Sequence, residues 1–398
     1  MAGEGGVVRT GRVARNDEAI AAVVIDVLAD AGLAQLTAAE VARRTGMSKR
    51  PVLVRYPTRS SLAVAAWTEC GAALSKLLND VVQTDDAERR LAAWNSLSSP
   101  SPEVRAAAEL IVAAQFDEDL SSVIKDTLGM DLRKWINGTP EDKARAAYVI
   151  GTGLGLLWVS RYPVVRGLGF RRDLSRIDAA VRTPREPVEL PDPPAPHLDT
   201  TEIQTGDSIR DALLRATCEV VGAVGFDAAT TSRIAGEAGV SEGALFRRYP
   251  SKLALFLDAT QHQQHVALRA NDAFLAELEA AYSRGTAEAV TIKQFCRSDR
   301  APLRTLMLEQ LRISWHDADL LAATSGELDE FIDEYVRQRP NVAEADLRAD
   351  AVIGIAVGTG MPVLAALHEA ASTYPYDVVT IPLEDGELDA KSERLERN

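Results

Sequence analysis

Basic side chains follow a serine in the stretch MSKRPVLVRYPTR, residues 47–59. Serine is a favoured helix N-cap, so Ser48 places Lys49 and Arg50 in the first turn of a helix that begins directly after it. An arginine at that position can donate two hydrogen bonds to the O6 and N7 atoms of a guanine, and other basic and hydroxyl side chains bind phosphate. The chemistry that this spacing indicates is recognition of double-stranded DNA.

The stretch recurs 193 residues later as VSEGALFRRYPSK, residues 240–252. Around both copies, identical residues occur at the same offset. They are Gly32 and Gly225, Thr37 and Thr230, Ala42 and Ala235, Gly46 and Gly239, Ser48 and Ser241, Arg55 and Arg248, Tyr56 and Tyr249, and Pro57 and Pro250. The offset is 200 where FDEDL at residues 116–120 aligns with HDADL at residues 316–320, and 203 where residues 142–151 align with residues 345–354. A repeat that persists along the chain predicts an internal duplication.

Each copy of the stretch is preceded by a helical pattern. In the first copy, apolar residues recur with a period of about 3.6 residues up to Gly32, which suits the end of a helix. Thr37 and Glu40 then form a capping box for a short second helix, and Gly46 allows the turn into the helix that Ser48 caps. Two helices joined by such a turn cross at roughly 90–120° and form a helix-turn-helix, whose last helix can enter the major groove.

The turn of the second copy is surrounded by Ile234-Ala235, Ala238-Gly239-Val240-Ser241, Gly243-Ala244-Leu245-Phe246 and Tyr249-Pro250-Ser251-Lys252. The first copy has Val41-Ala42, Thr45-Gly46-Met47-Ser48 and Tyr56-Pro57-Thr58-Arg59 at the same places. These residues resemble the DNA-binding signature of TetR-type repressors. The first copy departs from that signature at Pro51 and at Leu53, because the family has an aromatic residue that touches a phosphate where this copy has Leu53.

The resemblance implies a fold and an assembly. TetR-type repressors are all-helical homodimers in which each subunit has one DNA-binding head and a ligand-binding helical body, and two C-terminal helices of each subunit pack in a four-helix interface. Two such repeats in one chain predict an all-α, single-chain pseudodimer, so that one chain is equivalent to a family dimer. The expected parts are a first helix-turn-helix head with a basic N-terminal arm at 1–62, a first body at 63–181, a Pro-rich linker at 182–206, a second helix-turn-helix head at 207–255, and a second body with a polar C-terminal tail at 256–398.

Closely spaced glycines lie in the two segments that should form the interface, residues 142–162 and 346–368. They are Gly151 and Gly155 in the first segment and Gly354 and Gly358 in the second. Glycine costs about 1 kcal/mol in a helix interior, so its use here predicts close approach of two helix backbones. The sequence GTGLG at residues 151–155 is also similar to a dinucleotide-binding loop, but it lacks the third glycine of that motif.

The residues expected to contact DNA belong to both heads. They are Arg9, Arg12, Thr37, Ser48, Lys49, Arg50, Arg55, Tyr56 and Arg59 in the first head, and Thr230, Ser241, Glu242, Gly243, Ala244, Phe246, Arg247, Arg248, Tyr249 and Lys252 in the second. The first head has nine basic and five acidic residues between positions 9 and 59, a net charge of +4, whereas positions 207–252 contain six of each. We therefore expect the first head to bind phosphate more strongly. Arg9 and Arg12 suit either a minor-groove arm or a solvated tail.

Six residues of the two bodies are candidates for binding a small-molecule effector. They are Trp94, Phe116, Trp158, Arg312, Trp315 and His316. A buried patch without a ligand explains the last three equally well. His262 and His265 have a helical spacing that suits a metal, but no carboxylate or cysteine pair accompanies them. The sequence has no set of nucleophile, base and orienting residue and no Walker-type loop, so we expect no enzyme activity, no metal and no other cofactor.

The composition restricts the compartment and the class of protein. A net charge of -14 argues against a protein that coats nucleic acid, but it allows a local basic face. Cys70, Cys218 and Cys296 are odd in number and far apart, so they indicate buried thiols in a reducing compartment. The N-terminal sequence MAGEGGVVRTGR lacks the apolar segment of a signal peptide. We expect a cytoplasmic protein with no membrane partner.

These observations favour a ligand-responsive transcriptional regulator, specifically a repressor, that reads an asymmetric operator with two non-identical heads. Its expected partners are a double-stranded DNA operator and an unknown small-molecule effector. In the family, effector binding changes the separation of the two heads, and the DNA is released when this no longer matches the half-site spacing. The alternative is a small-molecule binding or scaffold protein in which one head has lost DNA contact, which the departures at Pro51 and Leu53 favour.

Overall fold

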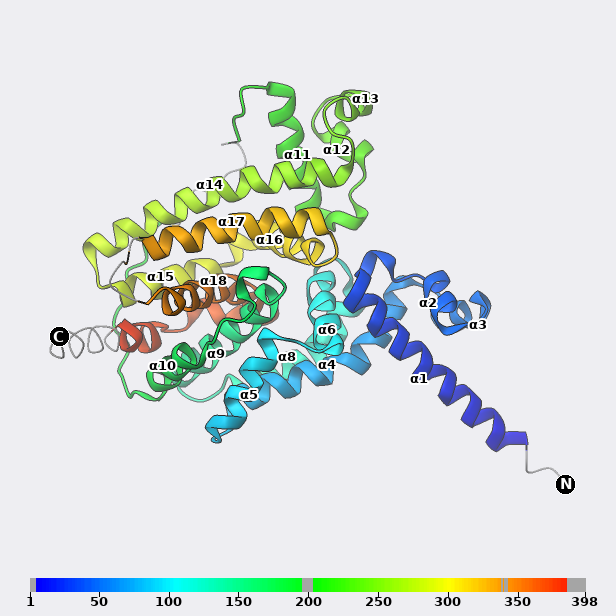
Figure 1. Cartoon of the computed structure of the whole chain (residues 1–398), viewed down its shortest axis with the longest axis horizontal. Helices are drawn as coiled ribbons and strands as arrows, with labels where there is room; N and C mark the ends of the chain where they lie inside the picture. Colours follow the sequence, from blue (N-terminus) through cyan, green and yellow to red (C-terminus); the bar gives the residue numbers. More distant parts are fainter. Residues whose placement is uncertain (1–4, 195–202, 338, 340–342, 385–398) are drawn as a thin grey trace.

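The computed structural model describes residues 5–194, 203–337, 339 and 343–384, and every regular element in these residues is a helix (Figure 1). The expectation of an all-α fold is therefore confirmed for the described part of the chain. We call residues 1–181 the first half and residues 207–398 the second half. Within them, residues 1–62 and 207–255 are the first and second heads, and residues 63–181 and 256–398 are the first and second bodies.

The helices follow the same order in both halves. The first half contains α1 (Gly5–Ala31), α2 (Ala38–Thr45), α3 (Lys49–Arg55), α4 (Arg59–Gln83), α5 (Ala87–Ser98), α6 (Pro102–Ala113), α7 (Glu118–Asp126), α8 (Leu128–Trp135), α9 (Pro140–Val159) and α10 (Arg171–Arg182). The second half contains α11 (Ser208–Ala228), α12 (Thr231–Glu237), α13 (Glu242–Phe246), α14 (Lys252–Ala281), α15 (Arg284–Cys296), α16 (Ala301–Ser314), α17 (Ala318–Arg337) and α18 (Glu344–Leu367). In Figure 1 the first head lies at the right and the second head at the top, and the bodies pack together between and to the left of them.

Both heads begin with a long helix that is broken at the same relative position. Gly32 has a φ of 76° at the end of α1, and Gly225 has a φ of 77° near the end of α11. A positive φ is readily accessible only to glycine, so these two residues set the direction in which the chain leaves the first helix of each head. Gly46 and Gly239 also have positive φ and form the turns before α3 and α13, as predicted.

The caps of the first head differ in detail from the expected ones. The Thr37 hydroxyl accepts the backbone N–H of Glu40, but the Glu40 carboxylate does not complete a capping box because it pairs with Arg43 and Arg44. Ser48 lies at the N-cap of α3 without a side-chain hydrogen bond. Ser241, its equivalent in the second head, does accept the N–H of Ala244.

The N-terminal segment is helical from Gly5 onwards, because α1 includes it. The backbone of Arg9 and Arg12 therefore continues the first helix of the head and does not form the separate flexible arm that the sequence suggested. The side chains of these two arginines lie outside the described residues.

The two halves meet most extensively where α9 crosses α18. A Cβ atom on Gly155 would lie 1.7 Å from the carbonyl oxygen of Ala356, and one on Gly360 would lie 1.8 Å from the carbonyl oxygen of Gly151. Only glycine fits at positions 155 and 360. The two contacts are reciprocal if residue 151 of α9 is equivalent to residue 356 of α18, and residue 155 of α9 to residue 360 of α18. The expectation that two glycine-containing helices approach closely is confirmed, but the structural register differs from the one read from the sequence.

The glycines predicted for α18 are not the ones at the crossing. Gly354 is exposed and a Cβ atom there would meet nothing within 4 Å, while Gly358 faces only Phe295 at 3.8 Å. In the part of the chain that the structure describes, α18 is also the one helix long and apolar enough to cross a membrane. Because 67% of its apolar window is buried, it has the environment of a core helix.

Charged side chains join α10 to α18 beside this crossing. The Arg172 guanidinium lies 2.7 Å from carboxylate oxygens of both Asp346 and Asp350, and Arg176 lies 3.1 Å from Asp350. Asp173 is 4% exposed on the same face. Burial, together with the neighbouring Asp350 carboxylate, raises the pKa of Asp173 to about 7.

The segment between the halves has no regular structure at residues 184–194, as predicted for the linker. It follows the surface of the second body, because the Val188 N–H donates to Asp377 at 2.7 Å and Gln294 donates to the carbonyl oxygen of Pro193 at 3.2 Å. Ile203, where the chain is described again, is buried against the second head. Residues 184–194 of the linker therefore lie against the second body.

Replacing Gly155 with alanine should separate α9 from α18 and lower the free energy of unfolding by about 1–3 kcal/mol, because the added methyl group overlaps a backbone carbonyl. Gly354→Ala is the matched control, since this glycine lies in the same pair of helices with open space around it. It should raise stability by about 0.5–1 kcal/mol through helix propensity. Urea unfolding of both variants tests the register, and equal effects would contradict it.

Replacing Asp173 with asparagine should flatten the pH dependence of stability. The pKa of Asp173 is about 7 in the folded protein and has its ordinary value of 3.8 in the unfolded chain. Between pH 3.8 and about 7, Asp173 is therefore protonated in the folded protein and ionised in the unfolded chain. The free energy of unfolding falls as pH rises through this window, because the folded state binds the additional proton. The slope is at most about 1.4 kcal/mol per pH unit. Urea unfolding at several pH values measures it, and Asp346→Asn, in the same cluster, should retain the slope.

Candidate nucleic-acid interface

The first head holds α3 against its core through one side chain. Val52 points inward and is 0% exposed, packed in the same core as Val41 and Ala42 of α2. The rest of α3 faces solvent, including Leu53 at 40% and Val54 at 78% exposure. Val54 therefore adds nothing to the core of the head, and the outer face of α3 is open to solvent.

Basic side chains surround this exposed face. Lys49 and Arg50 lie in the first turn of α3, Arg55 in its last turn and Arg59 in the first turn of α4, and all four are exposed. Of the other predicted contacts of this head, Tyr56 is half-buried, whereas Thr37 is exposed and its hydroxyl caps α2. Ser48 is exposed at the start of α3. Arg59 also lines a small cavity between the two halves, together with Leu33 and Arg312. Contact of Lys49 and Arg50 with bases and of Arg55 with phosphate stays a prediction.

The second head has a shorter third helix with a different surface. Leu245 points into the core at 0% exposure, as Val52 does in the first head, and Ala244 is also buried. Gly243, Phe246 and Arg247 are exposed, with Phe246 at 51%. Phe246 stands at the position of Leu53, so both heads present a large apolar side chain there.

Glu242 begins α13 with a negative charge that is held in place. Its carboxylate accepts the hydroxyl of Thr231 at 2.6 Å, while the Thr230 hydroxyl accepts the N–H of Arg233 as the cap of α12. Arg233 is exposed in the first turn of α12 but was absent from the expected contacts. The sequence signal for it is a basic residue three positions after the N-cap Thr230, in the first turn of the second helix.

Three residues expected at the DNA surface have partners inside the second head. The ammonium of Lys252 donates to the carbonyl oxygens of Phe226 at 2.7 Å and Ala229 at 2.8 Å, and burial lowers its pKa. Tyr249 is 8% exposed and its hydroxyl donates to Asp258. Arg248 forms an ion pair with Asp207, N to O 3.0 Å, at the start of α11. In this structure these side chains hold the head together, because each satisfies a polar group that folding brings near.

The six effector candidates do not meet in one pocket. Trp94 is buried beside Gly153 within the first body, where a Cβ atom on the glycine would lie 3.5 Å from the tryptophan ring. Trp158 and Trp315 stack on each other across the two halves with ring centroids 4.3 Å apart. Arg312 and His316 pair with buried carboxylates. Five of the six residues therefore belong to the core of the first body or to the contact between the two halves. Phe116 remains as a candidate for contact with a ligand.

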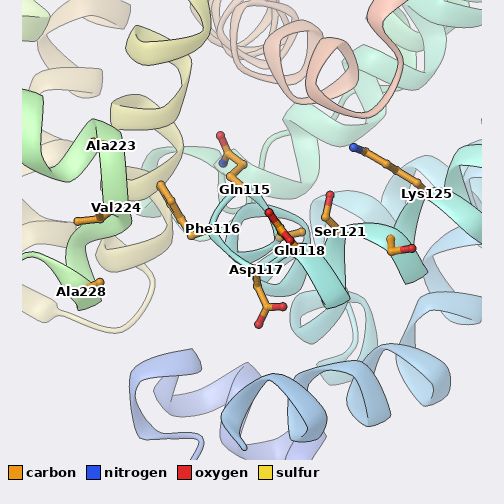
Figure 2. Close-up of a pocket in the computed structure, with 11 residues that line it drawn as sticks. Gln115, Phe116, Asp117, Glu118, Ser121, Lys125, Ala223, Val224 and Ala228 are labelled. Carbon is orange, nitrogen blue, oxygen red and sulfur yellow. The ribbon is translucent and has the colours of Figure 1, made fainter.

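A cleft with a volume of about 720 Å³ opens between the first body and the second head, and Phe116 lies on its wall (Figure 2). Its floor is the segment from Ala114 to α7, and Val224 and Ala228 of α11 face it from the second half. The polar side chains of the lining are Gln115, Asp117, Glu118, Ser121, Ser122 and Lys125. A smaller cavity of about 120 Å³ shares Phe116, Asp117, Val224 and Ala228 with it and reaches Glu309 and Arg312. A ligand in this cleft would contact both halves.

His262 lies beside a carboxylate, and the three cysteines are buried. His262 Nδ1 lies 3.2 Å from Asp258, and the side chain of His265 lies outside the described residues. Among the described residues, no group of three or more His, Cys, Asp or Glu side chains is arranged to hold a metal. Cys70, Cys218 and Cys296 are buried free thiols whose pKa burial raises to about 12. These thiols are therefore unreactive in the folded protein.

Comparison with protein families finds a match between residues 213–259 and the family of bacterial regulatory proteins, tetR family. The match spans most of α11, all of α12 and α13 and the start of α14, and so it includes the complete second helix-turn-helix. A search of curated proteins found no match. The family match supports a TetR-type DNA-binding head in the second half of the chain.

Replacing Lys252 with methionine should lower the stability of the protein by about 1–3 kcal/mol, because two buried carbonyl groups lose their donor. Lys49→Met, which removes an exposed ammonium from the other head, should leave stability unchanged. Thermal unfolding of the two variants measures the difference. Wild-type stability of Lys252→Met combined with weaker DNA binding would instead identify Lys252 as a phosphate contact.

Proposed function

We propose that this protein is a DNA-binding transcriptional regulator in which both heads of one chain contact a single operator. The observation that carries the proposal is that the tetR-family match covers a complete helix-turn-helix in the second half. The first head repeats its design, with glycines at the same two turns and one inward apolar residue on the third helix. Such a third helix is suited to entering the major groove.

The arrangement of the halves supports a single-chain pseudodimer. Gly155 of α9 meets the backbone of Ala356 in α18, and Gly360 of α18 meets the backbone of Gly151 in α9, so each helix brings a glycine against the other, as paired helices can across the interface of a homodimer. The α9 and α18 helices would then be the fused counterpart of a dimer interface. In this proposal a second chain is not required to present two heads to DNA.

The two heads differ in the side chains that would meet the bases, so we propose an asymmetric operator. Arg50 can donate to a guanine, whereas the equivalent position in the second head is Gly243. Lys49 corresponds to Glu242, whose carboxylate accepts hydrogen bonds and repels phosphate. Because a homodimer must present identical heads and a fused chain need not, the two half-sites are free to differ.

The cleft beside Phe116 supports a role for a small-molecule effector. Its walls come from the first body and from α11 of the second head, so a ligand there can bind one relative position of these parts better than another. A differential affinity of this kind typically couples two sites by about 1–3 kcal/mol. We propose that an effector bound in the cleft weakens DNA binding and that the regulator, acting in the cytoplasm, is a repressor.

Selection of binding sites from random DNA should return two different half-sites. Arg50→Ala should relax the base preference in one half-site only, with a loss of about 1–3 kcal/mol for the preferred base, because only the first head has this donor. Arg55→Ala should weaken binding to all sequences, since it serves the backbone. Arg171→Ala, an exposed arginine on α10, is the control and should bind like the wild type.

The outcome that would contradict the asymmetric operator is a perfect inverted repeat, or an equal effect of Arg50→Ala on both half-sites. Recovery of a single half-site would favour the alternative in which one head has lost DNA contact. Failure to select any sequence would contradict the proposed function itself.

A further inference from the structure

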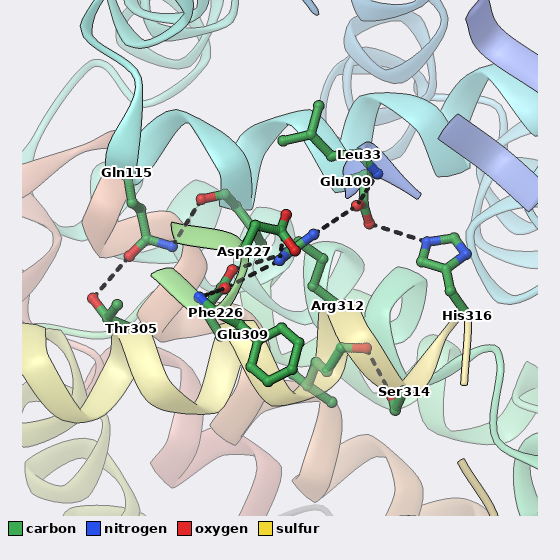
Figure 3. Close-up of polar contacts among 12 residues, drawn as sticks. Leu33, Glu109, Gln115, Phe226, Asp227, Thr305, Glu309, Arg312, Ser314 and His316 are labelled. Carbon is green, nitrogen blue, oxygen red and sulfur yellow. Dashed lines mark hydrogen bonds and ion pairs between the residues drawn. The ribbon is translucent and has the colours of Figure 1, made fainter. Parts of the chain in front are cut away.

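A cluster of buried charges lies where the two halves meet, and Arg312 is at its centre (Figure 3). Glu109 on α6 is 0% exposed and Glu309 on α16 is 1% exposed. The Arg312 guanidinium donates to Glu309 through Nε at 2.8 Å and through Nη2 at 3.1 Å, and to Glu109 through Nη1 at 3.1 Å. One cation therefore binds a carboxylate from each half, Glu109 on α6 of the first body and Glu309 on α16 of the second body.

Each of these carboxylates also holds the turn of one head. Glu109 accepts the backbone N–H of Leu33 at 2.9 Å, and Glu309 accepts the backbone N–H of Phe226 at 2.7 Å. Leu33 and Phe226 are the residues directly after the positive-φ glycines that end the first helix of each head. The same residue type thus performs the same function in both halves, with separations of 76 and 83 residues between donor and acceptor.

The turns are also packed against the opposite half. A Cβ atom on Gly32 would lie 2.6 Å from the ring of His316, and one on Gly225 would lie 2.9 Å from the ring of Phe116. His316 and Phe116 occupy equivalent positions of the repeat, at an offset of 200. The turn of each head therefore contacts the body of the other half, at His316 just after α16 and at Phe116 in the 3-10 turn that follows α6.

The cluster is asymmetric at its cation. Val112 occupies the position in the first half that corresponds to Arg312. Asp227 accepts a hydrogen bond from Arg312 at 3.3 Å, and its counterpart in the first half is Ala34. Although burial alone would raise it, the pKa of Glu109 is lowered by the Arg312 guanidinium and by His316.

We propose that Arg312 is a positioning residue that sets the separation of the two heads, and thereby the operator spacing that the protein accepts. The chain of contacts runs from the Leu33 N–H through Glu109, Arg312 and Glu309 to the Phe226 N–H. Every link is a hydrogen bond or ion pair of 3.1 Å or less, and the two ion pairs in the middle are buried, so a change in the separation of the two turns stretches or breaks at least one of them. The reading of operator spacing depends on the proposed function, but the separation of the heads does not.

The test measures the distance between the heads without DNA. Spin labels attached at Val54→Cys and Arg247→Cys report one exposed position at the third helix of each head, and the three native thiols are buried and do not interfere. The main variant combines Arg312→Met with Glu109→Gln and Glu309→Gln. The glutamine oxygens still accept the two backbone N–H groups, and neither buried glutamate is left as an unpaired charge. Asp227 also loses Arg312 as a partner, but its side chain is 20% exposed and can be solvated.

The distribution of distances between the two spin labels should broaden about twofold in this variant, because the ion pairs that join the two halves at Arg312 are lost. Arg90→Met is the matched control, since Arg90 is a buried arginine whose ionic partner, Asp178, lies in the same half. It should keep the wild-type distribution even if it lowers stability. Arg312→Lys retains the charge but cannot make the bidentate pair with Glu309 and reach Glu109 as well, so it should give an intermediate width.

Binding to operators with altered half-site spacing provides the second measurement. The wild-type preference for one spacing should fall about tenfold in the triple variant, with little change in the base preference of either half-site. A wild-type distance distribution in the folded triple variant would overturn the proposal. If the wild type binds no DNA, the proposed function fails, and the distance measurement still decides the role of Arg312.

Discussion

The close crossing of α9 and α18 is the constraint on which the rest of the structure depends. At Gly155 and Gly360 the two backbones approach so closely that a single methyl group would overlap the opposite helix. Helices in such contact gain dispersion energy along their length, but they lose it steeply when they separate. The crossing therefore fixes the bodies relative to each other, and only rigidly placed bodies can hold two heads at a defined separation.

The buried charges around Arg312 restrict the relative position of the two halves more than they stabilise the fold. Removing an arginine and two glutamates from water is costly, and the ion pairs formed in the interior offset this cost only if their geometry is good. Here the geometry is good, since Arg312 makes a bidentate pair with Glu309 and the carboxylates also accept backbone N–H groups. An apolar cluster would tolerate small shifts between the halves, whereas hydrogen bonds with fixed donors and acceptors do not.

The two heads share a framework but have different surfaces. Their turns and inward residues are alike because both must cross two short helices in the same way. On the exposed face of the third helix the first head has Lys49 and Arg50, while the second head has Glu242 and Gly243. Framework residues are restricted by packing and backbone geometry, and surface residues are restricted only by what they bind. Two heads with the same framework can therefore have different surfaces without loss of fold.

The sequence by itself determined the helices of both heads, since caps, positive-φ glycines and apolar periodicity act over a few residues and are read from the chain directly. It also predicted that two glycine-containing helices pack closely. Tertiary structure decided which atoms meet there: Ala356 and Gly360 lie at the crossing and not Gly354 and Gly358. It also turned Lys252 and Tyr249 inward and joined Arg312 to Glu109, 203 residues away. Contacts between residues so far apart depend on helix rotation and register, for which a local pattern carries no signal.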